Sequence, residues 1–239
     1  MDDDSKTYYF SATWAVLFLF LTLNLVPIPF AYLISFLGEW IYQNPVTVDM
    51  NFLGEVKMYP VADNLNSIIS MSAIMLFILW RMRSRNIPFD KLGSLVLYKK
   101  DLLLGSLFLA IFVGLEEIYM RALGLEIPKG FIVFMLSEPL FLSFISVIII
   151  APIAEEFLFR GFLYSQLQRT QLGSWGSVTA ISFLWTIIHF QYEPLILIVL
   201  FLFGMFLGYV RIAYNSLSLP IALHAINNLF AFIIIYFFG

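Results

Sequence analysis

Apolar residues fill most of the chain in long stretches that contain no Asp, Glu, Lys or Arg. Crossing about 30 Å of hydrocarbon takes a helix of about 20 such residues. Charge-free stretches cover residues 7–38, 64–80, 170–192, 194–210 and 212–239, and segments 102–115, 131–150 and 151–168 are similar but carry or adjoin a few charges. The pattern predicts an all-α polytopic membrane protein, a bundle of about eight transmembrane helices in a single membrane domain covering residues 1–239.

Composition narrows the function classes. Hydrophobic residues make up 61% of the 239 residues and charged residues 12%, which excludes an ordinary soluble domain. A net charge of −3 leaves no cationic field for a nucleic acid, so nucleic acids are excluded as partners and the lipid bilayer is the partner expected from composition. There is no cysteine, which excludes disulfides, thiolate nucleophiles and Cys-based metal sites.

Charges in the connections predict the orientation. Segment 81–101 holds six Lys and Arg residues, and the positive-inside rule places it in the cytoplasm. The N-terminus is then also cytoplasmic, and the connection 39–63 is outside. Because the N-terminal residues are acidic rather than basic, we expect the first helix to be retained as an anchor instead of being cleaved as a signal.

Several ionisable or polar groups interrupt the apolar segments. A charge at mid-bilayer costs about 2.5 to 3.5 kcal/mol on insertion scales, so such groups usually face a bundle interior or a cavity. The clusters are Glu116 and Glu117 with Arg121, Glu155 and Glu156 with Arg160, His189 alone, and His224 with Asn228. Both histidines of the chain are among them.

Spacing suggests different roles within these clusters. Glu156 and Arg160 are one helical turn apart and can pair, whereas Glu155 points about 100° away and suits a general base. His224 and Asn228 also share a face and could hold a water, a metal or an oxyanion. The alternative is structural: an ion-pair network that orders the bundle, and histidines that only bond between helices.

Three motifs in this order resemble those of the CPBP family, the CAAX protease and bacteriocin-processing (Abi) intramembrane proteases. Residues 151–161 resemble its EExxxR motif, Trp185 to His189 its FxxxH motif, and His224 to Asn228 its HxxxN motif. The chain is therefore similar to type II CAAX prenyl endopeptidases. The resemblance covers residues 151–239, while the helices of residues 1–150 carry no recognised motif.

The resemblance implies an endopeptidase that hydrolyses a peptide bond with an activated water and forms no acyl-enzyme. Glu155 and His189 would activate the water, and His224 and Asn228 would donate hydrogen bonds to the tetrahedral oxyanion. The substrate would be of the CAAX type, a bacteriocin-related peptide or a membrane protein.

Supporting roles fall to three further residues. Glu156 and Arg160 would orient the catalytic helix. Trp185 replaces the usual Phe of the second motif, and we expect it to supply an aromatic surface and no proton.

The EExxxR spacing occurs twice, because Glu116, Glu117 and Arg121 repeat it. The flanks of Glu155, Ala-Pro-Ile before and Phe-Arg-Gly after, match the family, so Glu155 is predicted to be catalytic. Of the second segment, Glu116, Glu117 and Arg121, we expect Glu116 to form an interfacial ion pair with Arg121.

The sequence leaves alternatives for the cofactor and for the class of function. We prefer metal-free glutamate catalysis, while a zinc ion held by Glu155, His189 and His224 is the other version, and the family is commonly labelled a metalloprotease. A non-enzymatic membrane immunity or scaffold protein is the main alternative function. A proton-coupled transporter is less favoured, because no inverted repeat is visible.

Overall fold

The computed structural model describes residues 46–49, 55–136 and 139–238. Five helices within these ranges are long and apolar enough to cross a membrane: Val61–Ser84, Lys99–Leu123, Leu140–Leu167, Pro194–Tyr214 and Ser218–Phe238. They support a multi-pass integral membrane protein, and the predicted count of about eight is not confirmed. The helix expected at residues 7–38 and the N-terminus lie outside the described residues.

One expected helix boundary is wrong. The segments 131–150 and 151–168 were predicted as two helices, but residues 140–167 form one continuous helix, which we call the motif helix. It consists of α6 (Leu140–Ser143), a π-helical stretch (Phe144–Ile150), α7 (Ala151–Glu156), a second π-helical stretch (Phe157–Leu163) and α8 (Tyr164–Leu167). The real boundary is at Pro139, whose extended backbone separates α6 from the short helix α5 (Lys129–Met135).

Proline does not end the motif helix at Pro152. A proline inside an α-helix lacks an N–H donor, and its ring collides with the carbonyl four residues before it. Directly before Pro152 the helix is π-helical, and the N–H of Ala151 bonds to the carbonyl of Ser146, five residues back. The wider turn accommodates the ring, so the helix continues through the proline into the two glutamates.

Other helices also differ in length from the predicted spans. α9 (Gly173–Ile187) has 15 residues, about 22 Å at 1.5 Å per residue, and residues 188–193 form a turn instead of extending it. α10 (Pro194–Tyr214) runs through Arg211, where the apolar stretches were divided. The chain reverses at Asn215, whose φ is 45°, and α11 (Ser218–Phe238) follows.

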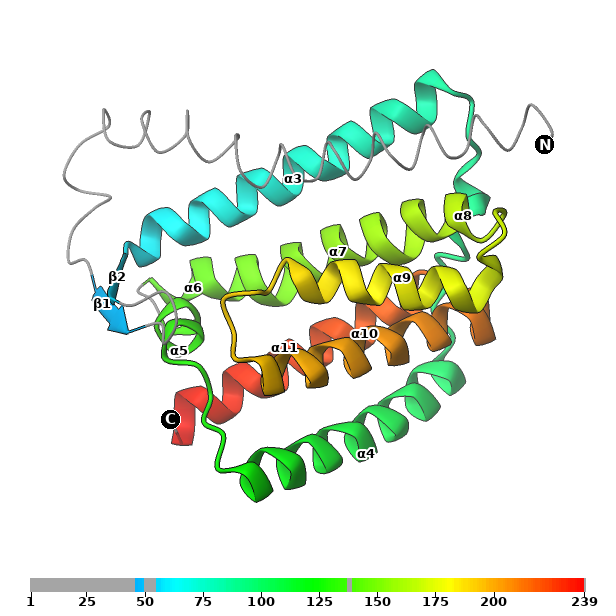
Figure 1. Ribbon diagram of the computed structural model, residues 1–239. Coiled ribbons are helices and arrows are strands. Elements are labelled where there is room, and N and C mark those ends of the chain that lie inside the picture. The colour runs from blue at the N-terminus through cyan, green and yellow to red at the C-terminus, as the bar shows by residue number, and fades with distance from the viewer. Residues whose placement is uncertain (1–45, 50–54, 137–138, 239) are drawn as a thin grey trace, which may run out of the picture.

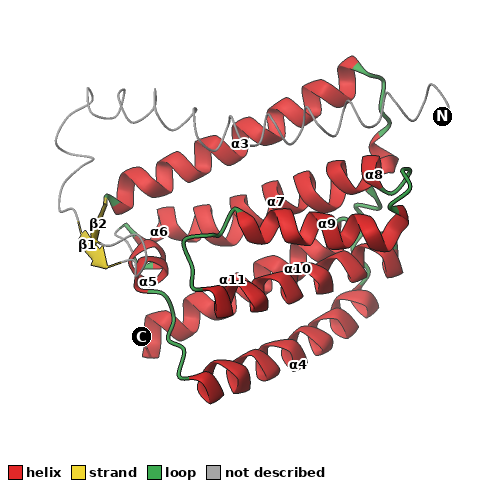
Figure 2. Ribbon diagram, in the orientation of Figure 1, coloured by secondary structure: helices red, strands yellow, loops and turns green. Residues whose placement is uncertain are grey.

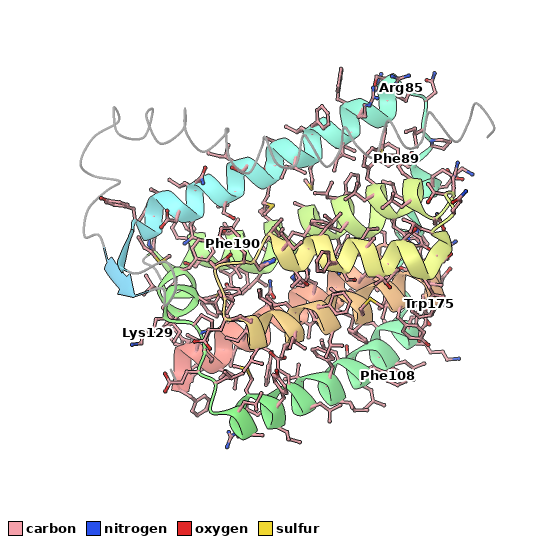
Figure 3. The ribbon with its side chains drawn as sticks, viewed as in Figure 1. Arg85, Phe89, Phe108, Lys129, Trp175 and Phe190 are labelled. Atoms are coloured by element: carbon pink, nitrogen blue, oxygen red, sulfur yellow. The ribbon has the colours of Figure 1, made fainter. Side chains whose placement is uncertain are left out.

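Helices run in both directions across the bundle (Figure 1). α3 (Pro60–Ser84), the motif helix and α10 run toward the end marked by Arg85 and Phe89 in Figure 3, and α4 (Lys99–Leu123), α9 and α11 run back. Glu155 lies twelve residues before the end of the motif helix and Trp185 twelve residues after the start of α9. The two residues are therefore at similar depth.

A short hairpin lies at the opposite end of the bundle (Figure 2). Strands β1 (Val46–Asp49) and β2 (Glu55–Met58) pair antiparallel, with Val46 opposite Met58 and Asp49 opposite Glu55. The hairpin belongs to the connection 39–63, which was expected to contain no membrane span. Apart from it, the regular structure of the described residues is helical.

Polarity is reversed relative to a soluble protein. The helix α4 presents an exposed apolar stripe at intervals of three and four residues: Leu103, Leu107, Ile111, Leu115 and Ile118. Buried positions in the bundle include Glu156, Arg160 and His224. Apolar side chains outside and charged ones inside are the arrangement expected in lipid, where a charge must find its partner within the protein.

Candidate active site

An ion-pair network forms the centre of the site. Glu156 accepts a hydrogen bond from Arg160 Nη1 at 2.9 Å, one helical turn along the motif helix. His224 of α11 approaches the same carboxylate oxygen with its Nδ1 at 3.0 Å. All three side chains are buried, so the charges of Glu156 and Arg160 neutralise each other away from lipid and water.

Glu155 faces a different neighbour. Its Oε2 accepts a hydrogen bond of 2.6 Å from the indole Nε1–H of Trp185 in α9. No Lys or Arg pairs with Glu155 in the part of the chain that the structure describes. Trp185 therefore adds to its aromatic surface a hydrogen bond that was not expected from the sequence, because a tryptophan at this position donates an N–H that a phenylalanine lacks.

The Trp185 indole connects the remaining groups. Its ring centre lies 4.8 Å from that of His189 and 5.8 Å from that of His224. The guanidinium carbon of Arg160 lies 5.3 Å from the same indole, within cation–π distance. Residues from the turn after α9, from α11 and from the motif helix are thus gathered around one aromatic side chain.

Hydrogen bonds assign the tautomers of both histidines. Nδ1 of His189 lies 2.8 Å from the backbone carbonyl of Trp185, and a carbonyl can only accept, so Nδ1 carries the proton. Nδ1 of His224 faces the Glu156 carboxylate and is protonated for the same reason. This leaves the Nε2 atom of each imidazole for another partner.

Asn228 has a structural partner in the motif helix. Its Nδ2 donates to the backbone carbonyl of Val147 at 2.9 Å. In a π-helical pattern this carbonyl would accept from the residue five positions later, which is Pro152 and has no N–H. Asn228 therefore replaces the missing backbone donor. The carbonyl that it bonds lies eight residues before Glu155 in the chain, so this amide N–H is not bonded to the Glu155 carboxylate.

Two glycines let α10 approach the site closely. A Cβ at Gly204 would lie 3.2 Å from Arg160 Nη2, and one at Gly208 would lie 2.3 Å from a methyl carbon of Val178 in α9. Small residues four apart commonly allow such close helix packing in membranes. The close approach places the Gly204 carbonyl 3.0 Å from Arg160 Nη2, so α10 supplies one of the hydrogen-bond acceptors of this arginine.

A second buried arginine was not identified as functional from the sequence. Arg211 of α10 donates from Nε to the backbone carbonyl of Arg160 at 3.0 Å and from Nη1 to Asn215 at 2.9 Å. Its guanidinium also lies over the Tyr164 ring. The signal available in the sequence was a lone Arg between two apolar stretches, which was interpreted as a helix boundary.

The second EExxxR segment lies apart from this network, on α4. The predicted ion pair of Glu116 with Arg121 is wrong: Arg121 pairs with Glu117 on the exposed surface, because these two residues are one helical turn apart. Glu116 lines an apolar groove of about 470 Å³ between α4 and α10, together with residues such as Phe112 and Leu202. Neither glutamate contributes to the cluster around Trp185.

The three donors considered for zinc do not form a metal-binding cluster. Among the described residues, no group of three or more His, Asp and Glu side chains converges closely enough to hold a metal ion. Glu155 is bonded to Trp185, while His224 is bonded to Glu156. These bonds use Nδ1 of each histidine and leave Nε2 for another partner, which is also the pattern of histidines that bind metals.

Comparison with known families agrees with the motifs. Residues 137–230 match the family described as type II CAAX prenyl endopeptidase Rce1-like, a range that includes every residue from Glu155 to Asn228. The match supports membership of the CPBP/CAAX protease family and implies protease activity. Comparisons with curated proteins and with solved structures gave no significant match.

Proposed function

We propose that this protein is an intramembrane endopeptidase in which Glu155 and His189 activate a water molecule for attack on a peptide bond. The observation that carries the proposal is the contrast between two adjacent buried carboxylates. Glu156 is bonded to Arg160 and His224, whereas among the described residues Glu155 is bonded only to an indole N–H, which leaves one of its oxygens for a water. Glu155 is thus the carboxylate that can gain and lose a proton.

His189 is suited to assist at this step. Its Nδ1–H is held by the Trp185 carbonyl, so its Nε2 is an acceptor that can orient or receive a proton from the water. The proton taken from the water passes to Glu155 and then to the leaving amine. The hydroxide oxygen adds to the carbonyl carbon, and the C–N bond breaks when the tetrahedral intermediate collapses.

Stabilisation of the oxyanion would come from α11. The Nδ1–H of His224 is bonded to the Glu156 carboxylate, and its Nε2, when it carries a proton, would donate to the oxyanion. Asn228 carries a second N–H besides the one bonded to Val147, and we propose it as the other donor. Arg160 donates a hydrogen bond to Glu156 and so supports the position of His224 indirectly.

A peptide presented at the membrane is the proposed substrate class. The matched family suggests a prenylated C-terminal CAAX peptide as the first candidate, and bacteriocin-related peptides and membrane-protein segments are the others to compare. We also propose that the end of the bundle carrying segment 81–101 is cytoplasmic, because its Arg and Lys residues follow the positive-inside rule.

The test is cleavage of a peptide panel, with and without a prenyl group, by the purified protein and by two variants. Glu155→Gln keeps the volume of the side chain but not the base, and should lower turnover by about 10²- to 10⁴-fold. Glu116→Gln is the matched control and should cleave normally. If Glu155→Gln retains activity, or if it keeps the biological phenotype of the native chain, the catalytic proposal is wrong and a scaffold role is favoured.

Chelation separates the two versions of the chemistry. With glutamate alone, prolonged treatment with a strong chelator should leave turnover unchanged. If the chelator abolishes turnover and added zinc restores it, a metal participates and the metal-free version is wrong.

A further inference from the structure

The turn after α9 places a tyrosine against the site. Residues 188–193 connect α9 to α10, and the backbone N–H of Tyr192 bonds to the carbonyl of His189 at 3.0 Å. The two rings are stacked, with centres 6.1 Å apart and planes 23° from parallel. The turn thus folds the Tyr192 ring onto the imidazole assigned to water activation.

Tyr192 has a second aromatic contact, with the short helix α5. The ring of Phe131 in α5 meets Tyr192 edge-on, with centres 6.4 Å apart. His189 is half-buried and lies beyond the last residue of α9, so the helix alone does not determine its position. Its ring therefore contacts both the Trp185 indole and a tyrosine that α5 supports.

The charge state of Tyr192 is compatible with this position. Burial raises the pKa of Tyr192, a hydrogen bond with Gln191 opposes the change, and the negative charge of Glu155 adds to it, giving a value of about 12. The phenol is thus neutral at all working pH values. It lies close enough to feel the Glu155 carboxylate without adding a second negative charge beside it.

We propose that Tyr192 is a positioning residue of the active site, whose ring stacks on the His189 imidazole and holds it in register with Glu155. The inference rests on the proposed function, because it assigns Tyr192 a role through His189. The aromatic ring carries the role, and the hydroxyl is secondary. Misplacing a catalytic group by about 1 Å can cost about 10²-fold in rate, so a modest contact of this kind has a measurable effect.

Variants at position 192 test the proposal by kinetics. Tyr192→Phe keeps the ring and should hold kcat within about threefold of the native value. Tyr192→Leu removes the ring and should lower kcat by about 10- to 100-fold with little change in KM. The matched control is Tyr209→Leu, which removes a tyrosine from the exposed stack with Trp175 and should leave both constants unchanged.

A measurement that does not depend on activity separates this inference from the function itself. The chain has two histidines, so isotope-labelled histidine gives two sets of ring resonances, which a His224→Ala variant assigns. Tyr192→Leu should shift the His189 resonances and leave those of His224 in place, and Tyr209→Leu should shift neither. Unchanged His189 resonances in Tyr192→Leu would overturn the stacking role.

The kinetic outcomes distinguish the two failures. If Glu155→Gln is inactive but Tyr192→Leu has native kcat, the inference is wrong and the proposed function stands. If Glu155→Gln remains active, the proposed function fails, and the resonances still report whether Tyr192 positions His189. Loss of the native thermal unfolding transition in Tyr192→Leu, with Tyr192→Phe also impaired, would mean that the residue supports folding rather than His189.

Discussion

The two EExxxR segments have the same spacing and opposite environments. In the segment from Glu116 to Arg121, the paired side chains of Glu117 and Arg121 are 58% and 81% exposed. In the segment from Glu155 to Arg160, those of Glu156 and Arg160 are 0% and 2% exposed. Helical geometry alone forms both ion pairs, so the spacing of the motif specifies a pair and its burial decides what the pair can do.

Burial also changes the number of partners. Arg121 pairs with Glu117, one helical turn before it on the same helix. Arg160 combines Glu156 with the Gly204 carbonyl of α10 and the Trp185 ring of α9. The buried pair therefore links three helices, whereas the exposed pair stays within α4.

The largest difference is expected when each arginine is removed. Arg160→Ala removes the arginine partner of the buried Glu156 and leaves only the contact with His224 among the described residues, which should cost about 3 to 5 kcal/mol and abolish most activity. Arg121→Ala removes an exposed pair worth about 0 to 1 kcal/mol and should leave activity intact. Unfolding in detergent and peptide cleavage measure the two effects. Equal losses in both variants would contradict the assignment of the segment from Glu155 to Arg160 as the site.

A smaller effect is expected at Trp185, the residue that donates a hydrogen bond to Glu155. Trp185→Phe keeps a ring of the family's usual kind but removes the N–H that bonds to the carboxylate. Hydrogen bonds to charged groups contribute about 1.5 to 3 kcal/mol, so stability should fall by about this amount and kcat by about tenfold. Trp175→Phe, at an exposed position of the same helix, is the control. A native kcat in Trp185→Phe would show that the aromatic surface is sufficient.

The smallest effect compares a glycine from each region. Gly208→Ala would place a Cβ 2.3 Å from Val178 and should cost about 1 to 3 kcal/mol, chiefly by moving α10 away from α9. Gly114→Ala in α4 meets nothing within 4 Å and should be neutral or stabilise the helix by up to about 1 kcal/mol. Thermal unfolding of both variants checks this. A destabilised Gly114→Ala would mean that α4 packs more tightly than the structure shows.

Some of this arrangement follows directly from the sequence. Apolar stretches predict the spans of α3, α10 and α11, because a membrane requires such runs. The spacing of Glu156 and Arg160 predicts their pair, since residues four apart meet on any helix. Both are local properties.

Other features depend on contacts between distant segments. The motif helix continues through Pro152 because a π-helical stretch precedes the proline. The conformational propensities of the individual residues do not predict that stretch. Asn228 donates to the Val147 carbonyl in place of the N–H that Pro152 lacks, and Pro152 precedes Asn228 by 76 residues. Tyr192 lies in a turn and belongs to no motif, so only the fold shows its ring against His189.

The π-helical stretches also determine how the motif helix responds to changes in length. A π-helical turn holds an extra residue, so deleting one residue from Phe144–Ile150 would favour an ordinary α-helix. Everything before the deletion would then rotate by about 100° relative to Glu155, because each α-helical residue turns the helix by that angle. Ser143 would leave its bond with Asn64 of α3. Insertions and deletions in this helix should therefore be far more harmful than substitutions of similar size, even at positions where the side chain faces lipid.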